Sequence, residues 1–265
     1  MTTTKNFCAV AVIPAHLASV RFPRKILFEF HGLPMIEHVR RRALMSPSLD
    51  RVIVATCDEE IASAIRGFGG EVIMTANTHR NGTTRVAEAV KNVDCSHVVL
   101  LQGDEPLLLP RHIDSLVGAM RAEPDNVAWN ATGPIENAEE LDRHSFVKCA
   151  ISPAGRIMYC FRRSPCFSDY ESQRRFIRKI LGIIAYRKDF LQEITAALAT
   201  PIEQSEFIEQ MRIIENGYPL KSLPVEPSLP SVNEPHEAEI VWDYVRNDPE
   251  QQGLLDRVLS GEPPR

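Results

Sequence analysis

The chain has 265 residues, enough for one large α/β domain or two small ones, and 44% apolar with 25% charged residues is an ordinary globular composition. A formal net charge of −5 argues against a surface that binds nucleic acid polymers, because such surfaces usually carry a basic excess. No stretch reaches the roughly 20 apolar residues of a membrane span, and the first residues lack the apolar core of a signal peptide, so we expect a cytoplasmic protein.

The cysteines and histidines form no pattern typical of a metal site or a disulfide framework. The six cysteines are scattered without a C-x-x-C pair, and the eight histidines include no H-E-x-x-H spacing. We therefore expect core thiols, and neither a zinc site nor disulfides.

An apolar run near the N-terminus leads into a basic loop. Residues 8–13 lack alternation and are too few for a typical helix, so they predict a strand buried on both faces, ended by Pro14. Arg21, Arg24 and Lys25 follow this strand. Parallel strands deliver function at their carboxyl ends, and cations there can bind phosphates and neutralise a leaving pyrophosphate. A solvated basic turn would have the same residue types, so residue type alone leaves both interpretations open.

Helices and strands then alternate. Residues 35–45 have helical spacing, residues 51–56 form a second buried strand, and Asp58 can cap a helix that ends at Gly69. Residues 71–74 form a short third strand. This β-α-β-α-β order predicts a right-handed, mostly parallel sheet.

The segment from Met74 to Arg85 is rich in turn-forming residues and precedes a helix that we expect to begin near Thr83. Small polar residues before a helix N-terminus favour an anion or nucleotide contact. A capped helix without a ligand is the alternative.

The clearest buried strand is His97 to Leu101, which continues directly into Gln102-Gly103-Asp104-Glu105-Pro106. An acid just beyond a central strand can hold Mg²⁺ against phosphates, because hard cations prefer carboxylate oxygens. The alternative is an aspartate that starts a turn before Pro106. Asp104 is the first choice for a metal ligand.

The second half of the chain has a different order of helices and strands. A helix should follow Pro110 to about Glu123, and the mixed strands beyond it suggest that the sheet is extended and that an acceptor-binding lobe is added. No flexible linker appears, so we predict one domain over residues 1–265, with a nucleotide-binding half at about 7–125 and an acceptor-binding half at about 126–258. The expected elements of this half are strands 127–132, 146–151, 157–161 and 180–186 and a helix around 136–141.

Three further segments complete the expectations for this half. The charged stretch Asp169 to Lys179 suggests a mobile loop. Thr200 caps a helix that continues to Arg212, with Glu203 on a solvated face. Asn233 suits the N-cap of a final helix.

Several strings resemble those of the 3-deoxy-manno-octulosonate (Kdo) cytidylyltransferases, from Val12 to Asp243. Residues 13–27, IPAHLASVRFPRKIL, are similar to the family's I-P-A-R-x-x-S-x-R-x-P-x-K-x-L, and residues 102–106 repeat its Q-G-D-E-P without change. Residues 79–85 and 200–212 resemble its H-x-S-G-T-(D/E)-R and S-P-L-E-x-x-E-x-L-E-Q-L-R.

The resemblance implies a Rossmann-like α/β nucleotidyltransferase with a mixed, mostly parallel central sheet, which uses Mg²⁺ and forms a homodimer, so that the half at about 126–258 is the acceptor-binding and dimerisation half. The implied substrates are CTP and a small acidic acceptor, with an acceptor oxygen attacking the α-phosphorus and pyrophosphate leaving. Carried over residue by residue, the implied roles are catalysis by Arg21, Lys25 and Asp104, nucleotide binding by Pro14, Ala15, His16, Arg21, Lys25, Asn81, Gly82 and Thr83, acceptor binding by Gln102, Arg162, Arg163, Glu209 and Gln210, and metal binding by Asp104 and Asn233.

Departures from the family pattern concentrate on the acceptor and metal positions. Ile180 and Ile184 replace a histidine and a tyrosine that face the sugar, and Asn233 replaces an aspartate of the metal site. His16 stands where the family has arginine, while Arg163 is an additional cation.

Kdo remains the leading acceptor because the family's acceptor residues Gln102, Arg162, Glu209 and Gln210 are all present. The departures favour the alternative, a modified Kdo or a small phosphonate acid. A nucleotide-binding module without catalysis is a second class of function. All these interpretations require Lys25 and Asp104 to converge on one triphosphate.

Overall fold

The computed structural model describes residues 7–19 and 21–261. The expectation that the N-terminus lacks a signal peptide falls, for residues 1–6, outside the described residues. The chain packs as two compact units, one made of residues up to Val117 together with Leu229 onward, and one of Gly118–Ser228. The second unit is therefore an insertion in the sequence of the first.

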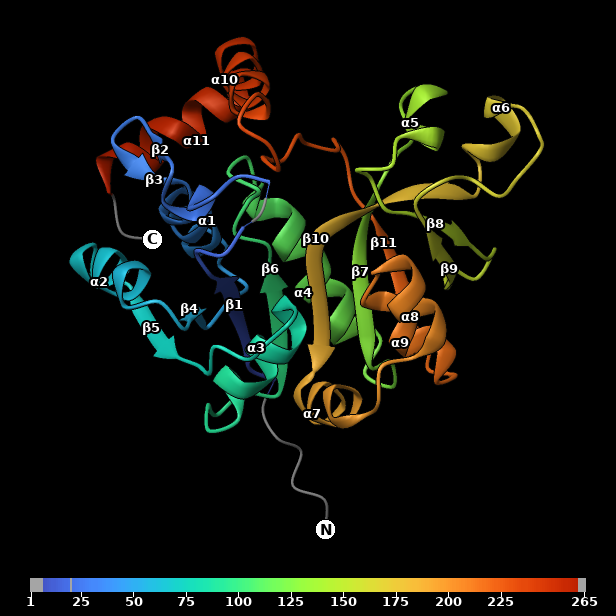
Figure 1. Ribbon diagram of the computed structural model, residues 1–265, viewed down its shortest axis with the longest axis horizontal. Helices are drawn as coiled ribbons and strands as arrows, with labels where there is room; N and C mark the ends of the chain where they lie inside the picture. Colours follow the sequence, from blue (N-terminus) through green and yellow to red (C-terminus); the bar gives the residue numbers. More distant parts are fainter. Residues whose placement is uncertain (1–6, 20, 262–265) are drawn as a thin grey trace. The chain divides into compact units, whose positions relative to one another are not determined.

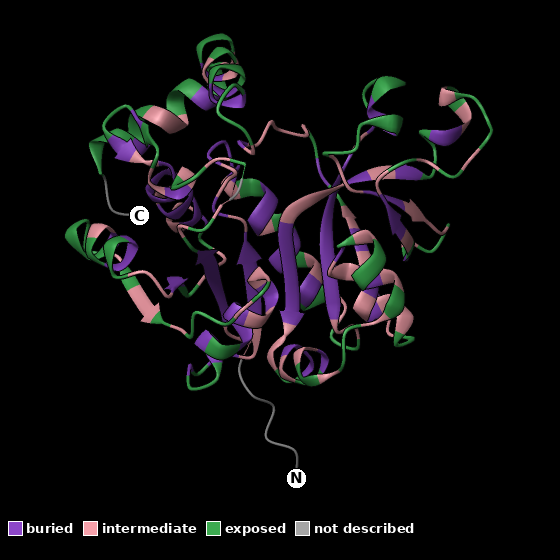
Figure 2. Cartoon of the chain, in the orientation of Figure 1, coloured by how far each residue is buried: buried purple, intermediate pink, exposed green. Residues whose placement is uncertain are grey.

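Four parallel strands form the sheet of the first unit, in the order β6-β1-β4-β5. They are β1 (Ala9–Ala15), β4 (Arg51–Thr56), β5 (Glu71–Met74) and β6 (His97–Leu101). All of β1 is buried, as Figure 2 shows, because it has neighbours on both edges and apolar side chains on both faces. The parallel β-α-β-α-β order predicted from the apolar runs is confirmed.

The expected end of the first strand at Pro14 is wrong, because β1 continues through Pro14 to Ala15. Pairing of β1 with β6 stops at Val12, so beyond it only the edge facing β4 is hydrogen-bonded. A proline, which has no N–H to donate, is tolerated where one edge no longer needs a donor.

The remaining elements of the first unit are mostly helices, several of them visible around the sheet in Figure 1. None of the helices among the described residues is long and apolar enough to cross a membrane. The elements are η1 (Lys25–Leu27), the short strands β2 (Glu29–Phe30) and β3 (Leu33–Pro34), α1 (Met35–Leu44), α2 (Glu59–Gly67), α3 (Gly82–Val90), α4 (Pro110–Ala122, which ends in the second unit), α10 (Glu237–Asn247) and α11 (Pro249–Ser260).

The C-terminal helices belong to the core of the first unit. Val232, Val241 and Val245 are buried in one cluster with Phe30 and Met35. The expected N-cap at Asn233 is wrong, since α10 begins at Glu237. The backbone N–H of Asn233 instead donates to the Glu237 carboxylate at 2.6 Å, so the acid of the helix closes the preceding turn.

The second unit has a mixed sheet in which β7 pairs with β11 in parallel and with β10 antiparallel, and β10, β8 and β9 pair antiparallel. The mixed texture expected of this half is confirmed, and so is the α/β fold class. The elements are β7 (Ala128–Gly133), α5 (Glu139–Asp142), β8 (Lys148–Ile151), β9 (Ile157–Phe161), α6 (Tyr170–Gln173), β10 (Ile177–Arg187), α7 (Lys188–Ala196), α8 (Pro201–Glu206), α9 (Gln210–Glu215) and β11 (Lys221–Pro224).

The expectation that the charged stretch from Asp169 to Lys179 is a mobile loop is wrong. Asp169 caps α6 by accepting from the N–H of Ser172 at 2.8 Å, and β10 already begins at Ile177. The side chain of Lys179 is buried and forms an ion pair with Glu140 at 2.8 Å.

The expectation of a single helix from Thr200 to Arg212 is also wrong. The segment forms two helices, α8 and α9, which are separated at Phe207, whose φ is 56°. Thr200 and Glu203 form the capping box of α8. Glu203 is buried and accepts two hydrogen bonds from Arg212 at 2.6 and 2.7 Å, so it does not lie on a solvated face. This ion pair joins the two short helices across the break.

We predict that Gly133→Ala lowers the free energy of unfolding by about 1–3 kcal/mol, as expected for overpacking. A Cβ at Gly133 would lie 2.8 Å from Cβ of Ser228, so the backbone around it would have to move. Urea unfolding measures the effect. The matched control is Gly118→Ala, inside α4 with open space around its Cβ position, which should stabilise the chain by about 0.5–1 kcal/mol. Equal effects of the two substitutions would contradict the prediction.

Candidate functional site

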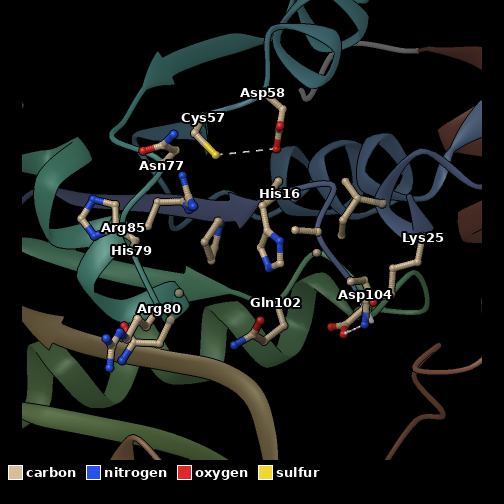
Figure 3. Close-up of a pocket in the computed structure, with 18 residues that line it drawn as sticks. His16, Lys25, Cys57, Asp58, Asn77, His79, Arg80, Arg85, Gln102 and Asp104 are labelled. Carbon is tan, nitrogen blue, oxygen red and sulfur yellow. Dashed lines mark hydrogen bonds and ion pairs between the residues drawn. The ribbon is translucent and has the colours of Figure 1, made fainter. Parts of the chain in front are cut away.

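A cavity of about 550 Å³ lies in the first unit at the carboxyl ends of β1, β4 and β6 (Figure 3). Because these strands are parallel neighbours, the residues that follow them meet at one edge of the sheet. Of the residues predicted to form a site, those that line the cavity are Pro14, Ala15, His16, Lys25, Asn81, Gly82, Gln102 and Asp104.

Lys25 and Asp104, which both line this cavity, form an ion pair. Lys25 Nζ lies 2.5 Å from Asp104 Oδ2, and the two side chains are 13% and 21% exposed. Lys25 Nζ also donates to the carbonyl oxygen of Val232 at 3.3 Å, and the N–H of Val232 donates to the carbonyl of Asp104 at 3.0 Å. The two charges therefore lie side by side, as the labelled side chains in Figure 3 show, and that they share one triphosphate stays a prediction.

The N-terminus of α3 forms another wall. Asn81 is both a cavity residue and the N-cap, since its side-chain oxygen accepts from the N–H of Thr84 at 3.0 Å. Gly82 lies so close to Pro14 that a Cβ would come within 3.0 Å of its Cγ. Thr83, predicted to contact the nucleotide, is buried and does not line the cavity. Asn81 can therefore cap the helix and also contact a ligand in the cavity.

Two arginines that the sequence analysis did not select, Arg80 and Arg85, also line the cavity. Arg85 is buried and donates to Thr75 Oγ1 at 2.6 Å and to the carbonyl of Ala76 at 3.3 Å, which holds its guanidinium in place. Together with Lys25 these side chains supply three cations, against the carboxylates of Asp58 and Asp104. This arrangement suits an anionic ligand.

His16 is kept neutral near pH 7 by its position in the cavity. Partial loss of hydration lowers the pKa of His16, and the nearby positive charge of Arg85 adds to this, against the opposite effect of Asp58. The histidine can therefore donate or accept a hydrogen bond without adding charge.

Asp58 was interpreted from the sequence as a helix cap, but its side chain makes no cap hydrogen bond to α2. Its carboxylate accepts instead from the N–H of Leu17 at 2.9 Å and holds the start of the loop after β1. With Cys57 it lines the cavity. Cys57 and Asp58 could have been found from the sequence by their position just after β4, a parallel neighbour of β1.

Arg21, Arg24 and Asn233 do not line the cavity. Arg21 Nη2 donates to Asn233 Oδ1 at 3.2 Å, so the predicted catalytic arginine and the predicted metal ligand contact each other. Arg24 is exposed and forms an ion pair with Glu60. The basic loop therefore directs one cation into the cavity and two elsewhere.

No group of three histidine, cysteine or acidic side chains among the described residues is arranged to hold a metal ion. Asp104 offers a single carboxylate at the cavity, and the Glu237 carboxylate is engaged with the N–H groups of Asn233 and Glu234. Such a site suits a cation that takes one or two protein ligands and the rest from phosphates, as Mg²⁺ does.

The predicted acceptor residues other than Gln102 lie in the second unit. Arg162 donates to the backbone carbonyls of Glu206 at 3.2 Å and His144 at 3.1 Å. Gln210 donates from Nε2 to Asn130 Oδ1 at 3.0 Å. Ile180 is partly exposed on β10 and Ile184 is buried.

Comparison with known proteins gives a consistent result. A family model described as cytidylyltransferase matches residues 10–223. The chain is 37% identical over 233 residues to the 3-deoxy-manno-octulosonate cytidylyltransferase of Geobacter metallireducens, covering 84% of this chain and 91% of that protein. It is 36% identical over 227 residues to the enzyme of the same name from Escherichia coli, covering 86% and 92%. A solved structure of CMP:2-keto-3-deoxy-manno-octonic acid synthetase complexed with CTP superposes with a TM-score of 0.84 at 35% identity, covering 90% of this chain and 98% of that one.

We predict that Lys25→Met weakens CTP binding by roughly tenfold or more, because methionine cannot donate the hydrogen bond that the lysine ammonium group would make to a phosphate oxygen. Isothermal titration calorimetry with CTP measures this. The matched control is Arg24→Met, which removes a neighbouring cation that is paired with Glu60 outside the cavity. Equal losses in the two variants would show that the loop acts only through its net charge.

Proposed function

Because the chain belongs to the Kdo cytidylyltransferase family, we propose that it transfers the cytidylyl group of CTP to Kdo, with release of pyrophosphate. An acceptor hydroxyl oxygen forms a bond to the α-phosphorus, the bond from this phosphorus to the oxygen bridging to the β-phosphate breaks, and pyrophosphate leaves with that electron pair. The hydroxyl proton is released to solvent. The observation that supports this best is the Lys25–Asp104 pair at 2.5 Å, held beside a cavity lined by further cations.

The residues act by position and charge, and no covalent enzyme intermediate is needed. In this proposal Lys25 binds phosphoryl oxygens, which its contacts with Asp104 and Val232 beside the cavity support. Arg85 adds a fixed positive charge in the cavity wall, while Arg21 is exposed and held by Asn233. Charge that grows on the leaving pyrophosphate is stabilised by these cations.

Asp104 would hold Mg²⁺, with Asn233 as the second ligand proposed from the sequence. The ion would neutralise and orient the phosphates. Lys25 contacts the same Asp104 carboxylate, so the lysine would have to move toward phosphate oxygens when a metal is bound. Asn233 contributes an oxygen without charge, and Arg21 engages that oxygen, so it is the weaker ligand of the two.

We assign acceptor recognition to Gln102, Arg162, Arg163, Glu209 and Gln210. Cations among them suit a carboxylate, and amides suit hydroxyl groups. A modified Kdo or a small phosphonate acid is the second candidate, favoured by Arg163, which is exposed and has no ion-pair partner among residues 7–19 and 21–261. The homodimer and the cytoplasmic location stay predictions.

Pyrophosphate release with CTP and a panel of acids tests the proposal. We expect turnover with Kdo. Turnover only with a phosphonate would favour the second candidate, and CTP binding without release for any acid would indicate a nucleotide-binding module.

Asp104→Asn should lower the rate of pyrophosphate release by roughly 10²–10³-fold, since it removes the charge that holds the metal and orients Lys25. Steady-state assays over a range of Mg²⁺ concentrations measure this. Asp94→Asn, an exposed aspartate outside the cavity, is the control. An unchanged rate in Asp104→Asn would mean that the metal lies elsewhere.

His16→Arg should lower the KM for CTP by about threefold to tenfold, because a charged donor replaces a neutral one near the triphosphate. The gain should shrink as salt is added. A raised KM at low ionic strength would instead show that repulsion from Arg85 and Lys25 dominates.

A further inference from the structure

We propose that Asn130 is a positioning residue that fixes the side chain of Gln210 for acceptor binding, an inference that rests on the function proposed above. Asn130 lies in the middle of β7 and is fully buried, an unusual place for a carboxamide. Nothing in its sequence neighbourhood marks it, and its contacts identify it.

The hydrogen bonds of Asn130 use both ends of its carboxamide. Nδ2 donates to the carbonyl oxygens of Ala131 at 2.8 Å and Leu181 at 3.0 Å, and Oδ1 accepts from Gln210 Nε2 at 3.0 Å. The opposite amide orientation would place its oxygen against two carbonyl oxygens, so only this one satisfies the network. Asn130 therefore joins β7, β10 and α9, which Figure 1 shows next to one another in the second unit.

The donor is needed because β10 is irregular here. Ile180 pairs with Thr132 and Ile184 with Asn130, so three residues of β10 face only Ala131 of β7. Such a bulge leaves carbonyl groups without ladder partners, and the buried side chain of Asn130 supplies a donor for one of them. The bulge lies between Ile180 and Ile184, the two positions where the sequence departs from the family's acceptor contacts.

This contact determines what Gln210 can offer a ligand. Gln210 begins α9 and is partly exposed, and one of its two Nε2 hydrogens is directed to Asn130. Within the described part of the chain Oε1 makes no hydrogen bond. Asn130 thus selects the orientation in which Oε1 remains available to accept a hydrogen bond from an acceptor hydroxyl.

A double-mutant cycle with Asn130→Ala and Gln210→Ala tests the inference, using KM for Kdo and KM for CTP as separate readouts. We expect Asn130→Ala to raise the KM for Kdo by roughly three- to tenfold and to change the KM for CTP by less than about twofold. The double variant should be no worse for Kdo than Gln210→Ala alone.

The control is Asn126→Ala, which removes an asparagine that donates to the carbonyl of Ala128, at the start of the same strand, at 3.0 Å. It should leave both KM values unchanged. If Asn130→Ala does not fold, Asn130→Ser replaces it, since serine can still donate to a carbonyl but is too short to reach Gln210.

An unchanged KM for Kdo, equal increases for Kdo and CTP, or multiplying effects in the double variant would each overturn the inference. A wild-type chain that releases no pyrophosphate with any acid would overturn the proposed function itself. If the wild type is active and Asn130→Ala leaves the KM for Kdo unchanged, only the positioning role of Asn130 is overturned.

Discussion

The ion pair of Lys25 and Asp104 is the contact on which the arrangement of the cavity depends. It connects the loop after β1 to the turn after β6, and through Val232 it includes the segment that returns from the second unit. Both charges are largely removed from water, so each depends on the other for compensation, and loss of one partner would leave an uncompensated charge. In the proposed function the same two groups engage the triphosphate and its cation, so ligand binding there exchanges one set of partners for another.

Around this pair the site is assembled from parts that are individually ordinary. A capped helix, a strand end and a basic loop occur in many proteins. Their convergence follows from the parallel sheet, which brings the ends of β1, β4 and β6 to one edge. The lowered pKa of His16 favours its neutral form among fixed cations, which limits the repulsion between positive charges in the cavity.

Much of the first unit could be predicted from the sequence, because buried parallel strands are continuous apolar runs. The bounds of β4, β5 and β6 agree with the predicted ones. The failures have a common origin in contacts between distant residues. The two short helices on either side of Phe207 are joined by the pairing of Glu203 with Arg212, and the Asp58 side chain accepts from the N–H of Leu17 and does not cap its helix. Local propensity contains no information about such partners. Asn130 is the extreme case, since its role depends on a bulge in another strand and on the first residue of α9.

The return of residues 229–261 to the first unit has a consequence for biosynthesis. Phe30 and Met35 emerge from the ribosome early, but Val241 and Val245, which bury them, are translated only after the entire inserted unit. An apolar surface of the nascent chain therefore stays open while more than a hundred further residues are added, and it cannot close before α10 has been translated. Truncation before α10 would leave that surface exposed, and such a chain should aggregate even though every strand of the parallel sheet is present.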